Sequence, residues 1–207
     1  MIDNHDDGQQ SISGSSSTAE LLVSLEANVN AQSRHGWAPI HFAAQNGHNN
    51  VATILIEAGA DLELKASFYH TWNDECKPCN STALQIAISE GRDEVVENLV
   101  AGGANVEEKD LFGAMPPQWY YQLDHTPHIL QHLLNSGASP EVLDESGNTL
   151  LMLAAWGGYL ESFRILLAAQ VDLDKKGFLN QTALMLARAE AKVIDSYTYP
   201  GLATQNI

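Results

Sequence analysis

Gly36-Trp37-Ala38-Pro39-Ile40-His41-Phe42-Ala43-Ala44-Gln45-Asn46-Gly47-His48 is a stretch of sequence that returns along the chain in altered form. Thr82, Thr149 and Thr182 each begin another copy, and Met115 begins a degenerate one. These four starting positions lie 33, 34 and 33 residues apart, and Ala38 precedes Thr82 by 44 residues. A fixed period of this length predicts stacked repeats, each of which buries its apolar face against its neighbours.

Each copy has the same internal order. A turn leads into a helix of small residues such as Ile40 to Ala44, and a glycine such as Gly47 ends it. A second helix then carries bulky apolar residues at three-to-four spacing, a helical rather than a strand-like period. The threonines that begin the copies are predicted to cap the first helices. Glycines are predicted to end the second helices, at Gly59, Gly103 and Gly137.

The period and the Thr-Pro-Leu-His-like starts resemble the ankyrin repeat, over about residues 18–195. The resemblance implies an all-α fold, an ankyrin-repeat solenoid of stacked helix-turn-helix units with short β-turn or hairpin fingers. It also implies a concave binding face, built from the finger tips and the exposed side of each first helix. For His41 it implies a structural role, with hydrogen bonds to nearby backbone.

We expect eight segments along the chain. The N-terminal tail is too polar to bury a core and should stay disordered, and Ser17 and Glu20 have the spacing of a capping box at the first helix. The segments are a tail at 1–16, a capping half repeat at 17–32, a repeat at 33–65, a repeat at 66–109 with an insertion at 68–79 that lengthens its finger loop, a degenerate repeat at 110–143, a repeat at 144–176, a C-terminal capping repeat at 177–195 and a tail at 196–207.

The chain is acidic, with ten Lys and Arg against twenty-six Asp and Glu and a net charge of −16. Such a charge repels phosphate, so we expect no binding to nucleic acid or to anionic membranes. It favours a protein partner with a basic patch, unless the acidity serves only solubility. No Lys or Arg lies between Lys109 and Arg164, so the middle of the array is predicted to be its most negative part.

The N-terminus lacks the basic and apolar regions of a signal peptide, and no apolar run reaches membrane-spanning length. Two cysteines are too few for a secreted disulfide framework. We therefore expect a cytoplasmic protein that is a monomer when free.

Cys76 and Cys79 have the spacing of a redox motif or of half a zinc site. His70, with Asp74 or Glu75, could supply the remaining ligands. The alternative is two ordinary thiols or a disulfide local to the loop.

His128 and His132 are four residues apart, so on a helix they share a face. The pair could chelate a metal, or it could gain charge near pH 6 and weaken the binding of a basic partner. The simpler alternative places both on the solvent face of a second helix whose apolar side faces the core.

The sequence holds no Gly-rich phosphate loop, no Gly-x-Ser-x-Gly and no His-Glu-x-x-His. We therefore expect a non-enzymatic protein-binding module that uses no cofactor. Two alternatives remain open. One is a stoichiometric inhibitor, such as an immunity protein that neutralises a basic toxin or enzyme. The other is a metal- or redox-regulated switch that uses Cys76 and Cys79 or His128 and His132.

The resemblance, carried over position by position, assigns the residues that should contact a partner. Large apolar side chains among them are suited to be anchors, because interfaces concentrate their energy in such residues. The alternative is that one or two fold back onto a neighbouring turn or onto the insertion. The assigned residues are Arg34, His35, Trp37, Gln45, Asn46, Leu111, Phe112, Gln122, Asp144, Glu145, Trp156, Phe178 and Leu179.

Overall fold

The computed structural model describes residues 16–72, 75–108, 127–144 and 147–187. These residues belong to two compact units, Met1–Ser139 and Pro140–Ile207, and we describe each unit by itself.

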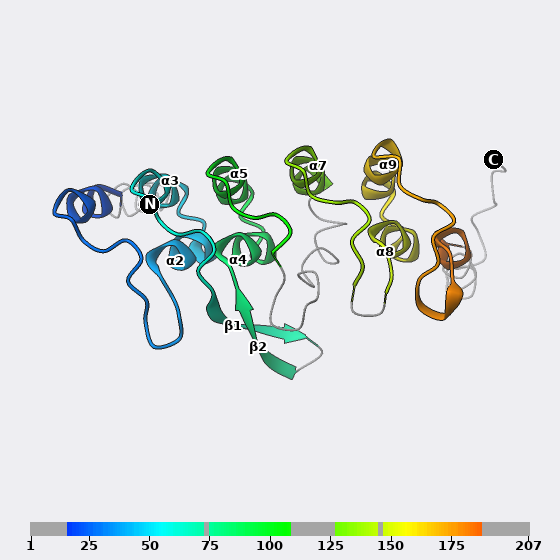
Figure 1. Ribbon diagram of the computed structural model, residues 1–207, viewed down its shortest axis with the longest axis horizontal. Coiled ribbons are helices and arrows are strands. Elements are labelled where there is room, and N and C mark those ends of the chain that lie inside the picture. The colour runs from blue at the N-terminus through cyan, green and yellow to red at the C-terminus, as the bar shows by residue number, and fades with distance from the viewer. Residues whose placement is uncertain (1–15, 73–74, 109–126, 145–146, 188–207) are drawn as a thin grey trace, which may run out of the picture. The chain divides into compact units, whose positions relative to one another are not determined.

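The helices of the first unit lie in two rows (Figure 1). One row holds the first helices of the repeats, α2 (Pro39–Asn46) and α4 (Ala83–Ser89). The other row holds the helix at 16–24 and the second helices α3 (Asn49–Glu57), α5 (Asp93–Ala101) and α7 (Pro127–Asn135). Neighbouring helices pack within each row and between the rows, so every repeat buries its apolar side against the next.

The second unit repeats this helix pair. The first helix α8 (Leu150–Gly157) packs on the second helix α9 (Leu160–Ala168). A short 3-10 turn, η1 (Phe178–Asn180), follows, and a further helix covers residues 183–187.

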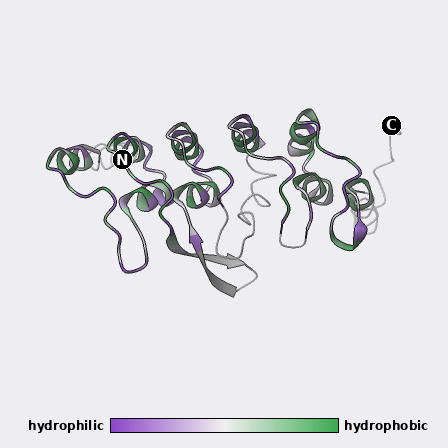
Figure 2. Ribbon diagram, viewed as in Figure 1, coloured by the Kyte–Doolittle hydropathy of each residue, from purple (hydrophilic) through white to green (hydrophobic). Residues whose placement is uncertain are grey.

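The core alternates small and bulky side chains. Ala43 and Ala44 of α2 are buried and allow neighbouring helices to approach closely, whereas the second helices contribute large residues such as Leu99 and Leu133. In Figure 2 the hydrophobic colour gathers on the helices, while the connecting loops are mostly hydrophilic. The two helices of a repeat therefore share one apolar layer.

The predicted helix boundaries are confirmed at several positions. The Thr82 hydroxyl accepts from the Gln85 amide at 3.4 Å, and the Thr149 hydroxyl accepts from the Met152 amide at 3.3 Å. Gly59, Gly103 and Gly137 all have positive φ values, the conformation that ends a helix and that glycine adopts at little cost. The N-terminal helix differs from the expectation, because it already includes residue 16, so Ser17 lies inside it rather than ahead of it.

The insertion at 68–79 was expected to lengthen a turn, but the structure forms a long hairpin there. Strand β1 (Ala66–Trp72) pairs antiparallel with strand β2 (Glu75–Ser81), in a register that runs from Ala66↔Ser81 to Trp72↔Glu75. β1 contains Phe, Tyr, Thr and Trp, the residue types that favour strands. The fold is therefore the expected all-α solenoid architecture, and the described finger at 66–81 is an extended hairpin.

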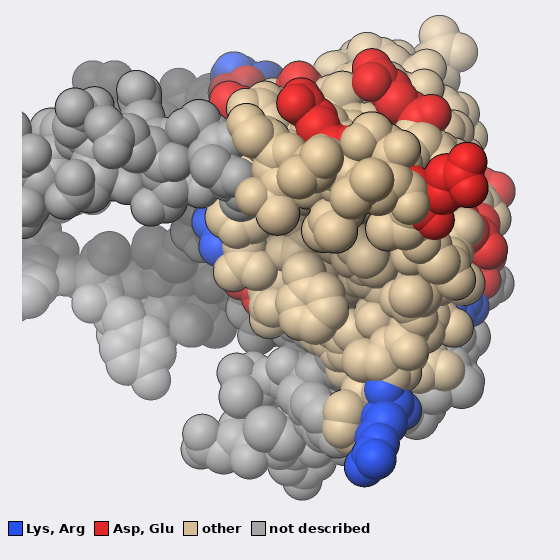
Figure 3. Space-filling view, turned by 90° about the vertical axis from the view of Figure 1, so that its left-hand side faces the viewer, with Lys and Arg blue, Asp and Glu red and all other residues tan. Residues whose placement is uncertain are grey.

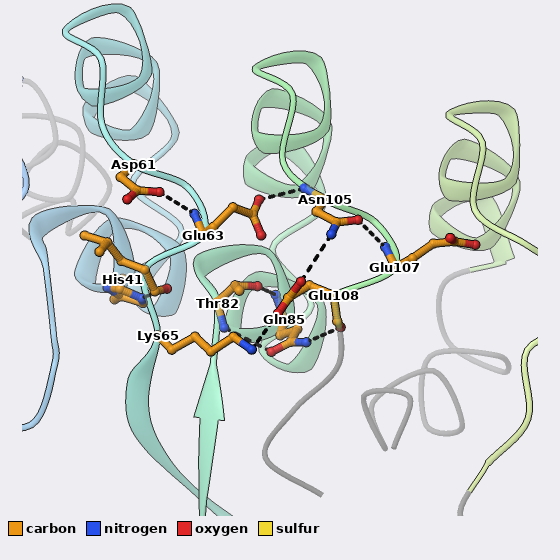
Figure 4. A network of polar contacts seen from close by, with 10 residues as sticks. His41, Asp61, Glu63, Lys65, Thr82, Gln85, Asn105, Glu107 and Glu108 are labelled. Atoms are coloured by element: carbon orange, nitrogen blue, oxygen red, sulfur yellow. Dashed lines mark hydrogen bonds and ion pairs between the residues drawn. The ribbon is translucent and has the colours of Figure 1, made fainter. Parts of the chain in front are cut away.

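A ladder of side-chain acceptors connects the loops that follow the second helices within each unit, and Figure 4 shows one of its steps, from Glu63 to the Asn105 amide. In each step a side-chain oxygen of one loop accepts from a backbone amide of the next. Three such bonds lie in the first unit and one in the second, with lengths of 2.7 to 3.0 Å: Asn30 to the Asp61 amide, Glu63 to the Asn105 amide, Glu107 to the Ser139 amide, and Glu141 to the Asp172 amide. All four bonds lie at the surface, and their acceptors, one asparagine and three glutamates, tie each loop to the next.

Candidate surface for partner binding

The first finger of the first unit, which precedes the hairpin finger at 66–81, is a tight turn at residues 33–37. The Ser33 amide donates to the Trp37 carbonyl at 2.9 Å, and the Gly36 amide donates to the Ser33 carbonyl at 3.0 Å. Gly36 has φ +79°, and a Cβ there would lie 2.5 Å from the Lys65 carbonyl oxygen. Glycine is therefore required both by the turn and by the close approach of the next loop. We call residues 33–37, with Phe42, Gln45 and Asn46 of α2, the finger face of the first unit.

The second unit contains the same turn twice. The Asp144 amide donates to the Asn148 carbonyl, and the Gly177 amide donates to the Gln181 carbonyl, both at 2.9 Å. In the second of these fingers Leu179 and Asn180 both adopt positive φ. We call Trp156, Phe178 and Leu179 the finger face of the second unit.

His41 lies behind the first finger and is fully buried. Its Nδ1 accepts from the Ala38 amide at 3.0 Å, and its Nε2 lies 2.9 Å from the Leu64 carbonyl oxygen. Since Nδ1 is an acceptor, the proton is on Nε2, which donates to that carbonyl. The structural role expected for His41 is confirmed.

Gln85 makes the equivalent pair of bonds in the next repeat. Its Oε1 accepts from the Thr82 amide at 3.0 Å, and its Nε2 donates to the Glu108 carbonyl at 2.7 Å (Figure 4). Both side chains thus connect the start of a first helix to the loop that begins the next repeat. Met152 holds this position in the second unit, where its Sδ lies 3.5 Å from the Thr149 amide.

Burial lowers the pKa of His41 below its usual 6.5, against the opposing effect of its two backbone hydrogen bonds. An unfolded chain would therefore bind a proton at this histidine more readily than the folded chain does. Neutral His41 therefore contributes fully to the free energy of unfolding above about pH 6.5. This contribution is lost as the pH falls below about 6.5 and through the lowered pKa of the folded chain.

We expect the free energy of unfolding to decrease between pH 7 and pH 5, by at most about 1.4 kcal/mol per pH unit from this group. His41→Gln should reduce that decrease, because glutamine does not titrate. His35→Gln is the matched control, since His35 is exposed. Urea unfolding at the two pH values measures the effect, and an unaltered pH dependence in His41→Gln would contradict it.

Trp37 does not project freely from the finger. Its Nε1 donates to the Ser67 carbonyl at 2.9 Å, and its ring centroid lies 4.9 Å from that of Phe42 and 6.0 Å from that of His41. The start of strand β1, in the next repeat, therefore holds this indole. Phe42 is 50% exposed and was not among the expected contact residues. It lies three and four positions before Gln45 and Asn46, a spacing that places all three on one helix face.

The other assigned residues of the first unit differ in their surroundings. Arg34 and His35 are exposed at the finger tip. The Gln45 carbonyl accepts from Arg92 Nε at 3.1 Å, and the exposed Asn46 donates through Nδ2 to the Phe42 carbonyl at 2.9 Å.

In the second unit Trp156 is 46% exposed, at the end of α8, and Phe178 and Leu179 are exposed on their finger. The Asp144 carboxylate accepts from the Asn148 amide at 2.7 Å. The remaining assigned residues lie outside the described residues: Leu111, Phe112, Gln122 and Glu145.

The described first helices α2, α4 and α8 carry no charged residues of their own, since no Asp, Glu, Lys or Arg occurs in any of them. The second helix α5, by contrast, contains three acidic residues, Asp93, Glu94 and Glu97. Figure 3 shows acidic side chains over the upper part of the view, on the side of the second helices, and a basic side chain projecting at the lower end. The first helices thus contribute no charge of their own, and Arg92 reaches the Gln45 carbonyl of α2 from the loop before α5.

The described carboxylates between Lys109 and Arg164 all have partners. Glu141 bonds Lys175 Nζ at 2.9 Å, which holds the pKa of Glu141 below its usual value, and it also accepts from the Asp172 amide. Glu161 pairs with Arg164 at 2.8 Å. The acidity predicted there is thus partly neutralised by local contacts.

Cys76 and Cys79 lie on the same strand, β2. A strand rises about 3.3 Å per residue, which separates their Cα atoms by roughly 10 Å, and a disulfide needs less than about 7 Å. The strand therefore opposes a local disulfide. The side chains of residues 68–79 lie outside the described part of the chain, and among the side chains that the structure does describe no group of three or more His, Cys, Asp and Glu is arranged to hold a metal ion.

His128 and His132 have different surroundings on α7. His128 Nε2 lies 2.7 Å from Asp93 Oδ2 of the preceding second helix α5. His132 Nε2 is buried and lacks a hydrogen-bond partner in the described part of the chain. The structure thus pairs His128 with a carboxylate rather than with His132.

Stacked helix pairs with finger turns define a repeat solenoid, and comparisons with known proteins identify its family. The family model for ankyrin repeats (three copies) matches residues 10–110 and 120–194. This chain belongs to the ankyrin-repeat family, whose repeats are typically non-enzymatic protein–protein interaction modules. None of the described helices is long and apolar enough to cross a membrane.

Individual relatives agree with this assignment. The chain is 30% identical over 179 residues to the B-cell lymphoma 3 protein homolog of Mus musculus, covering 84% of the chain and 37% of that protein. It is 31% identical over 185 residues to the ankyrin repeat and KH domain-containing protein mask-1 of Caenorhabditis elegans, covering 89% of the chain and 6% of that protein. The chain thus spans well under half of either relative.

A solved structure is similar as well. The crystal structure of the ankyrin repeat domain of Bcl-3, described as a unique member of the IkappaB protein family, superposes with a TM-score of 0.71 at 27% identity. The similarity covers 87% of this chain and 75% of that one.

Proposed function

We propose that this chain binds a protein partner through its two finger faces and performs no catalysis. The observation that carries the proposal is the pairing of uncharged first helices with exposed aromatic side chains. Phe42 and Trp156 are each about half exposed on such helices. At an exposed position a polar side chain would interact better with water. Aromatic side chains are instead enriched at the few interface residues that contribute most of the binding energy.

The partner that we propose has a basic surface. We propose further that this chain is cytoplasmic and is a monomer when free. The net charge of −16 attracts such a surface from a distance. Contact itself involves the uncharged first helices, so charge acts on the rate of association more than on the contacts. The same charge opposes binding to nucleic acid and to anionic membranes.

Affinity capture from the native cell, with the full chain as bait, tests the proposal. The captured protein is purified and its binding to the purified chain is measured directly. Stoichiometric binding of a protein supports the proposal. Capture of nucleic acid or lipid alone, or turnover of a substrate by the chain, would refute it.

The role of charge gives a separate prediction. Glu94→Lys combined with Glu97→Lys reverses two charges on α5, away from the first helices. We expect the association rate of the purified partner to fall several-fold at low salt, with little change in the dissociation rate. Raising the salt should reduce the difference between variant and wild type. A change confined to the dissociation rate would show that α5 is itself in the interface.

A further inference from the structure

The hairpin of β1 and β2 is a two-stranded sheet, so each strand has one edge that does not face the other strand. Such edges present backbone N–H and C=O groups and are templates for pairing with another chain. Figure 1 shows the hairpin on the same side of the first unit as the finger loop at 33–37.

The bonds of Ser67 show which backbone groups point outward. Its amide donates to the His35 carbonyl, and its carbonyl accepts from Trp37 Nε1, both at 2.9 Å. Both groups therefore point away from β2, which makes Ser67↔Asn80 a non-hydrogen-bonded pair. Because such pairs alternate along the ladder, Tyr69↔Pro78 and Thr71↔Cys76 are also of this type.

The two outer edges of the hairpin are consequently unequal. On β2 the middle outward position is Pro78, which has no N–H to offer, and proline protects an edge strand from further pairing. On β1, Tyr69 and Thr71 each direct a donor and an acceptor outward. The finger already pairs with Ser67, the preceding outward position of this edge.

We propose that the outer edge of β1, at Tyr69 and Thr71, binds an extended segment of the protein partner as an added strand. This inference rests on the proposed function and names the kind of segment that the partner supplies. Backbone pairing selects an extended conformation, so the segment is rich in β-branched or aromatic residues and has no proline at the paired positions. A second copy of this chain is disfavoured, because two chains of charge −16 repel each other.

Proline substitutions test the edge with a matched control. Thr71→Pro removes an outward N–H from β1, while Cys76→Pro removes one from the opposite member of the same pair, on β2. Thr71 and Cys76 face each other as a non-hydrogen-bonded pair, so neither substitution removes a hydrogen bond between β1 and β2. The probe is a peptide selected on the full chain from displayed short random peptides.

We expect Thr71→Pro to weaken binding of the selected peptide about tenfold or more, and Cys76→Pro to leave it unchanged within about twofold. Hydrogen exchange on the wild-type chain gives a second readout that needs no variant. The amides of Tyr69 and Thr71 should exchange more slowly when the peptide is present. Unchanged exchange at both amides, or equal weakening by the two prolines, would overturn the proposal.

Two further outcomes are informative. Sedimentation that shows a wild-type dimer and a monomeric Thr71→Pro variant would make a second copy the occupant and overturn the proposal. If the captured partner binds Thr71→Pro as well as wild type but is lost by Phe42→Ala with Trp156→Ala, the proposed function stands and the added strand does not.

Discussion

His41→Ala should lower the free energy of unfolding of the first unit by about 2–5 kcal/mol, because the Ala38 amide and the Leu64 carbonyl both lose their partner. The Ala38 amide then stays buried and the Leu64 carbonyl partly buried without a hydrogen bond, at a cost of about 1–3 kcal/mol for each group. Domains of this kind are stable by about 5–15 kcal/mol. The loss is therefore a large part of the total.

His41→Gln should cost about 1 kcal/mol or less, because Gln85 makes the same two bonds in the next repeat. Comparing the alanine and glutamine variants separates the effect of the two backbone hydrogen bonds of His41 from the effect of filling its site with a large side chain. Urea unfolding followed by circular dichroism measures both variants. Equal destabilisation by alanine and glutamine would show that the hydrogen bonds are not what His41 supplies.

The Phe42→Ala, Trp156→Ala double variant should bind the partner about a hundredfold more weakly or worse, since truncating an anchor typically costs about 2 kcal/mol or more. Both side chains are already about half exposed in the free chain, so their removal leaves little cavity. We therefore expect the urea midpoint to change little. The loss of affinity would then reflect missing contacts with the partner.

Leu22→Ala combined with Leu160→Ala is the matched control for this variant. Leu22 and Leu160 are 51% and 58% exposed, close to the 50% and 46% of Phe42 and Trp156, but Leu22 lies in the helix at 16–24 and Leu160 begins α9. The control should bind as wild type does. Titration calorimetry with the purified partner measures the affinity of both double variants. Equal affinities would place the interface elsewhere.

Much of the fold follows from local sequence. The threonine caps, the glycines at the helix ends and the buried apolar pairs of the second helices depend on neighbouring residues, so a repeated motif predicts them. The bonds of His41 follow the same rule, since the motif fixes its distance from the loop that it contacts. Gln85 occupies the corresponding place in the next copy, and its equivalent role was open to inference from that alignment.

The surroundings of the residues expected to contact a partner were less predictable, because contacts between repeats decide them. Trp37 was expected as an exposed anchor, but its indole bonds Ser67, 30 residues further along the chain. Glu107 and Glu141 contribute to a negative net charge, yet the structure uses their carboxylates to accept amides of the following loops. Such pairings depend on how the loops stack, and the composition of the chain does not show them.

Photo-crosslinking at Phe42 is the most direct test of partner binding through the finger faces. A benzophenone-bearing residue replaces Phe42 in one variant and Leu22 in another, two positions of nearly equal exposure in different parts of the first unit. With the captured partner present, irradiation should give a covalent complex from position 42 and little from position 22. Efficient crosslinking from position 22 and none from position 42 would contradict the account.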